Sequence, residues 1–133
     1  MNTFLIIIGL LLSIGLSSLF LIERKKGWCS NLIRFGISGF LFIIGLIGIL
    51  MLENLNKSER LFFIWIQIPL INTLVDKTFR FLSLKLHKRD LLLYIRGSSD
   101  LDFAFKNSDF KTSDYIFSTV LIILIFILPI IGL

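Results

Sequence analysis

The side chains best suited to acid–base, nucleophilic or metal chemistry are few in this sequence and lie far apart along it. His87 is the only histidine and Cys29 is the only cysteine. A structural zinc site uses three or four such ligands, and a nucleophilic site needs a nucleophile beside a base. Neither pattern occurs here, so we predict no metal, no cofactor and no enzymatic activity.

Aspartates are the second candidates for chemistry, and most of them lie in one short polar stretch. Residues 97–114 carry Asp100, Asp102, Asp109 and Asp114 among serines and phenylalanines. Carboxylate oxygens can hold a hard cation, but this spacing fits no calcium-binding loop. A solvated loop is the simpler interpretation. The alternative is an enzyme that modifies lipid headgroups, for which Asp90, Asp100 or Asp102 would be essential.

A third group of polar residues lies inside an otherwise apolar stretch: Gln67, Asn72, Asp76 and Arg80. Polar groups within a membrane segment are functional candidates by default. Asp76 and Arg80 are four residues apart, so they can pair on one helix. We expect these groups mainly to form hydrogen bonds between helices, with a water-filled path through an oligomer as the alternative.

The composition predicts that these residues belong to a membrane protein. The chain has 133 residues, of which 56% are hydrophobic and 17% charged, and its mean hydropathy is +0.90. Soluble proteins are roughly 45–50% apolar and about 25% charged, and a small soluble domain cannot bury a large excess of apolar surface. We therefore predict a single all-α integral membrane domain over residues 1–133. Its basic residues flank apolar stretches, which favours contact with lipid over nucleic acid.

Four apolar segments are candidate membrane spans, and three of them have the length of about 20 residues that a bilayer requires. These three are residues 3–22, 32–52 and 115–133. Asn31 is a plausible N-cap for the second, where Arg34 could extend to the headgroups. The remaining segment, 61–76, is shorter and contains Pro69.

The apolar pattern of this short segment continues beyond Asp76. Apolar residues recur at spacings of three and four through Leu86, opposite a polar stripe that ends near Asp90. We therefore predict one continuous helix from Leu61 to about Lys88, which leaves the bilayer near Asp76 as a cytoplasmic amphipathic extension. The alternation of residues 79–96 leaves a β-hairpin open as an alternative.

Lysine and arginine are distributed unequally between the loops that four spans would create. The loops at residues 23–31 (with Arg34) and 77–114 hold twelve of them, and the middle loop holds two. Because basic loops stay in the cytoplasm, this asymmetry predicts that both termini are outside. If segment 61–76 did not cross, the large basic loop would move outside, which is why we expect it to cross. The four-span pattern is similar to that of many small bacterial membrane proteins, so we expect a bacterial inner membrane.

Small residues mark the surfaces where helices could approach closely. In the first span they recur every four residues, and in the second they fall on two different faces, so that helix could meet two neighbours. They are Gly9, Ser13, Ser17, Gly36, Gly39, Gly45 and Gly48.

No motif assigns the chain to a family, so its function is a choice between hypotheses. The leading one is a non-enzymatic interaction or accessory subunit of a membrane complex, bound to another membrane protein or to copies of itself. Its partner-facing surface would be the basic residues Lys77, Arg80, Lys85, Lys88, Arg89 and Arg96. The first alternative is an oligomeric pore or membrane-permeabilising effector lined by the polar stripe, and the second is the lipid-headgroup enzyme.

Overall fold

The computed structural model describes residues 3–94 and 110–131, and every regular element in these ranges is a helix. In chain order they are α1 (Thr3–Leu10), the π-helix η1 (Leu11–Gly15), α2 (Leu16–Ile22), the 3₁₀ turn η2 (Gly27–Cys29), α3 (Asn31–Met51), α4 (Lys57–Trp65), α5 (Ile68–His87) and α7 (Thr112–Ile131). The prediction of an all-helical chain is therefore confirmed for these residues.

Three helical stretches are long and apolar enough to cross a membrane. They are Thr3–Ile22, Asn31–Met51 and Thr112–Ile131, which lie close to the three full-length spans expected from the sequence. The first contains a π-helical turn, Leu11–Gly15, at its centre, and turns of this kind locally widen a helix. By length and composition, these helices are compatible with the membrane character that the sequence indicates.

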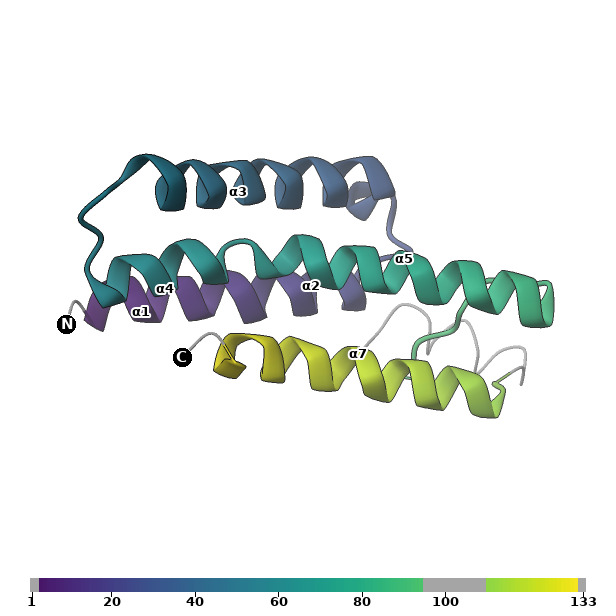
Figure 1. The fold of residues 1–133 in the computed structure, drawn as a ribbon. Coiled ribbons are helices and arrows are strands. Elements are labelled where there is room, and N and C mark those ends of the chain that lie inside the picture. Colours follow the sequence, from purple (N-terminus) through teal and green to yellow (C-terminus); the bar gives the residue numbers. More distant parts are fainter. Residues whose placement is uncertain (1–2, 95–109, 132–133) are drawn as a thin grey trace.

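The predicted continuous helix from Leu61 to Lys88 is wrong in one respect, because the helix is interrupted at Ile66 and Gln67. Pro69 has no N–H to donate to the carbonyl of Trp65, so the regular hydrogen bonding of a helix cannot pass this point. Figure 1 shows that α4 and α5 nevertheless lie end to end.

Residues 79–87 form the last part of α5, which favours the helix over the hairpin alternative. The helix ends at Lys88, which adopts a left-handed conformation (φ 57°) while its N–H bonds the carbonyl of Leu84 at 2.9 Å. The chain then runs through residues 89–94 without a helix or a strand.

The α4–α5 pair lies at the centre of the bundle, and all the long apolar helices pack against it. In Figure 1, α3 lies on one side, α7 on the other, and α1 and α2 run alongside. The start of α3 and the ends of α2 and α5 lie toward one end of the bundle, which we call the basic end because it carries Arg24, Arg34 and Lys77. The connection between α3 and α4 lies at the opposite end.

Two apolar clusters join the helices. Near the α4 end, Leu61, Trp65 and Ile68 are buried against α1 and α7, and the indole N–H of Trp65 donates to the carbonyl of Pro129 at 3.0 Å. Toward the basic end, the second cluster contains Leu21, Leu91, Leu93, Leu121 and Ile125. The two leucines at 91 and 93 show that the segment after α5 returns into the core.

The polar and apolar faces of α5 are placed in the reverse of the order found in a helix of a soluble protein. Its polar residues Asn72, Asp76 and Ser83 are buried, whereas large apolar residues such as Phe81 and Leu84 are exposed. A helix surrounded by water buries its apolar face. The opposite arrangement is what a surrounding apolar phase would favour.

Glycines let α3 approach the central helices. A Cβ on Gly45 would lie 2.7 Å from the carbonyl oxygen of Phe63, and a Cβ on Gly48 would lie 2.3 Å from the Phe63 ring. By contrast, no atom lies within 4 Å of a Cβ placed on Gly36 or Gly39. Gly45 and Gly48 therefore lie in close contact with Phe63, whereas the space beside Gly36 and Gly39 is open.

We predict that Gly45→Ala lowers the stability of the folded protein, because the Phe63 backbone cannot move aside as a flexible side chain could. Overpacking of this kind costs about 1–3 kcal/mol. Thermal unfolding in detergent, followed by circular dichroism, measures the effect. Gly36→Ala is the matched control and should leave the midpoint unchanged or raise it. Equal midpoints for the two variants would contradict the packing of α3 described above.

Candidate functional site: a buried charge cluster

The carboxylate of Asp76 is shared between two arginines, one from the turn that follows α2 and one from α3. Its Oδ1 accepts from Arg24 Nη1 at 2.7 Å, and its Oδ2 accepts from Arg34 Nη2 at 2.6 Å. The Asp76 and Arg34 side chains are 1% and 2% exposed. Charges removed from water to this extent need partners of opposite charge, so the three residues form one unit with a net positive charge.

This cluster corrects three expectations drawn from the sequence. Arg34 does not extend to the headgroups but points into the bundle, and Asp76 pairs with Arg24 and Arg34 rather than with Arg80. The N-cap of α3 is not Asn31 but Ser30, whose Oγ accepts from the Ile33 N–H at 3.4 Å. Arg34 lies one turn into α3, where its guanidinium meets Asp76 on α5.

Arg24 also connects the cluster to the segment that follows α5. Its Nη2 donates to the backbone carbonyl of Leu91. Residue 91 is fully buried beside Leu21 and Leu121. One arginine at the end of the first span therefore fixes both α5 and the chain that leaves it.

Further polar contacts hold residues 88–94 on either side of this point. Arg80 forms a bidentate ion pair with Asp90, in which Nε donates to Oδ1 at 2.9 Å and Nη2 donates to Oδ2 at 2.7 Å. Arg89 Nη2 lies 2.5 Å from Asp114 Oδ2 on α7. The Tyr94 N–H donates to the hydroxyl of Ser118 at 2.9 Å. The segment is thus tied to both α5 and α7.

The environment of two titratable groups near the cluster follows from these contacts. Burial alone would raise the pKa of Asp90, but the hydrogen bonds and charge of Arg80, aided by Arg24 and the Leu91 N–H, hold this pKa below its ordinary value. Asp90 therefore remains an ion-paired carboxylate at neutral pH. Burial raises the pKa of the Cys29 thiol, which makes it a poor nucleophile.

The residues proposed to line a path face the interior of this one chain. The amide of Asn72 donates from Nδ2 to Ser17 Oγ at 2.9 Å, and Gln67 donates to the carbonyl of Phe63 within its own helical turn. Arg80 lies nearer the surface, where it pairs with Asp90. Within the described part of the chain, Asn72 Oδ1 and Ser13 Oγ are buried and meet no partner.

The small residues of the first span pack within the chain. A Cβ on Gly9 would lie 2.8 Å from the Trp65 ring, and Ser13 and Ser17 are buried. Gly45 and Gly48 on α3 face α4, as described above. Only Gly36 and Gly39, among the small residues singled out in the sequence, lie against open space.

The predicted basic surface divides into two classes. Its described arginines, Arg80 and Arg89, are ion-paired with Asp90 and Asp114. Its lysines, Lys77, Lys85 and Lys88, are exposed. Arg96 lies outside the described residues, as do Asp100 and Asp102.

Sequence reasoning missed the Arg24–Asp76–Arg34 cluster and the burial of residues 91–93. A signal for the first was present, because ionisable residues near a span tend to pair with one another across helices. A signal for the second was the unbroken run Leu91-Leu92-Leu93, which lacks the alternation of a half-exposed strand. Among the described residues, no group of histidine, cysteine and carboxylate side chains could hold a metal.

Comparison of the chain with known proteins found no matching family, no similar curated protein and no similar solved structure. Any function therefore has to be inferred from the chain's own residues.

We predict that Asp76→Asn destabilises the protein severely, because it leaves two buried arginines without their carboxylate. Removing one partner of a buried ion pair costs about 3–5 kcal/mol. The measurement is the midpoint of thermal or denaturant unfolding in detergent.

The double variant Asp76→Asn/Arg34→Met tests whether the cause is the unpaired charge. It removes one of the two uncompensated arginines and should recover part of the lost stability. If the double variant were less stable than Asp76→Asn by the full effect of Arg34→Met alone, the two residues would not be coupled.

Proposed function

We propose that the chain crosses the membrane four times, with the α4–α5 pair as the third crossing and the basic end in the cytoplasm. The alternation of directions supports this: α2 ends, α3 begins, α5 ends and α7 begins toward the basic end (Figure 1). The buried polar face and exposed apolar face of α5 suit a helix in contact with lipid. The last part of α5 and residues 88–94 would then lie at the cytoplasmic interface.

Cysteine labelling from the two sides of the membrane tests this arrangement. In a Cys29→Ser background, we expect Asn54→Cys to react with an impermeant maleimide in intact cells. Lys85→Cys should react only after the cells are permeabilised. The reason is that the α4–α5 pair separates the two positions by one crossing.

Lys25→Cys is the control, because it should share the labelling pattern of Lys85→Cys. Reaction of the Asn54 and Lys85 variants from the same side would mean that α4–α5 does not cross.

We further propose that the protein is a non-enzymatic subunit of a membrane complex. The observation that carries this proposal is the bare face of α3 at Gly36 and Gly39, opposite the face that packs on Phe63. The sequence pattern predicts two neighbours for this helix. The chain itself supplies one, so we infer that the other is a transmembrane helix of a second polypeptide.

The physical argument is that glycines allow two helix backbones to approach closely, which increases packing contacts where no hydrophobic effect acts between helices. The bare face is continuous with large exposed apolar residues, including Phe40 and Ile43. Lipid can also cover such a face. However, the absence of side chains at Gly36 and Gly39 gives lipid no additional contacts, whereas it lets a second helix approach closely.

The rival hypotheses have less support from the described residues. A pore lined by Asn72 and Asp76 would have to pass through the interior of a single chain rather than between copies. There, Asp76 is already engaged by two arginines. A headgroup enzyme that used Asp90 would have to release it from Arg80.

The mass of the particle in a lipid nanodisc, measured by native mass spectrometry, tests the subunit hypothesis. We expect the wild type to occur with a second polypeptide, either a different protein or another copy. Gly36→Leu/Gly39→Leu should reduce the particle to a monomer, because leucine side chains prevent the close approach.

Ile37→Ala/Ile44→Ala, at exposed positions roughly 110–130° around the same helix from the glycines, is a control that leaves the proposed binding face intact and should keep the complex. A wild-type protein that is a stable monomer without any co-purifying partner would end the proposal.

A further inference from the structure

Basic side chains at the basic end are sorted by type. The four described arginines there, Arg24, Arg34, Arg80 and Arg89, are all engaged in ion pairs within the chain. The six described lysines are all exposed: Lys25, Lys26, Lys77, Lys85, Lys88 and Lys111. The arginines therefore serve the internal structure. Among the lysines, Lys26 forms a surface ion pair with Glu23, and the exposed lysines as a group supply the positive charge that this end presents outward.

Two of these lysines, Lys77 and Lys85, lie on α5 with exposed apolar residues, and Lys88 follows as the left-handed residue that ends the helix. Leu74, Lys77, Phe81, Leu84 and Lys88 follow one another at spacings of three and four, and Lys85 lies one turn from Phe81. The apolar members are 49%, 64% and 50% exposed in this order. We call this set the lysine face. It lies opposite the buried stripe of Asn72, Asp76 and Ser83.

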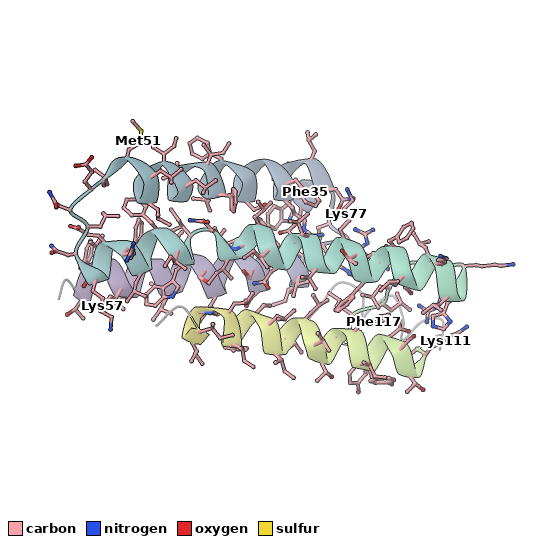
Figure 2. All side chains as sticks on the ribbon, in the orientation of Figure 1. Phe35, Met51, Lys57, Lys77, Lys111 and Phe117 are labelled. Carbon is pink, nitrogen blue, oxygen red and sulfur yellow. The ribbon has the colours of Figure 1, made fainter. Side chains whose placement is uncertain are left out.

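The lysine face begins beside α3 and continues past it. The ammonium of Lys77 lies 5.0 Å from the centre of the Phe35 ring, in the gap between α3 and α5 (Figure 2). Arg80 meets Asn31, the first residue of α3, so the later residues of α5 extend beyond that helix. Seven residues, 81–87, span about 10 Å, which is enough to cross one headgroup layer of about 5–8 Å.

Phosphate of an anionic lipid is the chemistry that suits this surface. Exposed leucine and phenylalanine need an apolar phase, while lysines beside them need anionic oxygen, and the membrane interface provides both. Recognition of a carboxylate with fixed geometry on a protein partner is better served by the planar guanidinium of arginine. The described arginines at this end already form ion pairs with aspartates of the chain. Lysine carries a mobile point charge, which suits phosphates that move within a fluid lipid layer.

We propose that Lys77, Lys85 and Lys88, with Phe81 and Leu84, form a binding surface for anionic phospholipids at the basic end. The proposal rests on the membrane insertion proposed above but not on the partner of α3. Each lysine near an anionic surface contributes enough attraction that removing two should weaken binding about tenfold or more. The attraction should also fall with salt.

The test is native mass spectrometry of the purified full chain in detergent, titrated with phosphatidylglycerol or with phosphatidylcholine. We expect the wild type to bind phosphatidylglycerol at least tenfold more tightly, and 0.5 M salt to reduce this preference. Lys77→Gln/Lys85→Gln should abolish most of it. Lys57→Gln/Arg60→Gln removes the same charge from exposed positions at the opposite end and should retain it.

Equal binding of the two lipids by the wild type would overturn the proposal. So would equal loss of preference in the two variants, because the effect would then depend on total charge rather than on the lysine face. Preferential binding of an acidic peptide over phosphatidylglycerol would assign the face to a protein. The same spectra report the subunit composition, so failure of lipid binding is distinguishable from failure of the partner proposal.

Discussion

The structure depends on one carboxylate. Asp76 lies on the central helix, and the two arginines that meet it come from the end of the first span and the start of α3. Without this contact, α5, with its buried polar residues, would lack the charged interaction that joins it to its neighbours at the centre of the bundle. Two buried guanidinium groups would also be uncompensated, which is far more costly than a missing apolar contact. Arg24 then extends the same unit to the Leu91 carbonyl, so that the packing of residues 88–94 depends on it as well.

The cluster explains why α5 is polar inside and apolar outside. Because α5 directs Asn72, Asp76 and Ser83 toward the neighbouring helices, its opposite face is exposed. This exposed face carries Leu74, Phe81 and Leu84. Apolar residues of the other helices then pack around the polar interior in two separate groups, one at Trp65 and one at Leu91. The apolar packing of the bundle is therefore divided into two groups rather than forming one continuous core.

Much of this architecture could be predicted from the sequence, because apolar length and charge distribution are local properties. The three long helices lie close to their predicted positions, and α5 contains the predicted periodicity. The partners of Asp76 could not be predicted in the same way. Spacing along one helix favours Arg80, whereas the actual partners lie 52 and 42 residues away, and only the three-dimensional packing brings them together. The interruption before Pro69 was readable in principle, since proline removes a donor wherever it stands. The run Leu91-Leu92-Leu93 indicates burial, but the place where these leucines pack depends on the space between α2, α5 and α7, which no local pattern reveals.

The separation in sequence of the three charged residues has a consequence for biosynthesis. A chain inserted from its N-terminus presents Arg24 and Arg34 well before Asp76 has been made. During that interval both arginines await their carboxylate partner, and in the four-span arrangement proposed above their charge would hold the first loop on the cytoplasmic side. Once the central helix arrives, the same two side chains exchange water for Asp76 and become part of the interior. Arg24 and Arg34 can thus act first as a topology signal during insertion and later as part of the buried ion-pair cluster of the folded protein. The described lysines of the basic end remain exposed in the folded protein, so they continue to supply positive charge there after Arg24 and Arg34 have become buried.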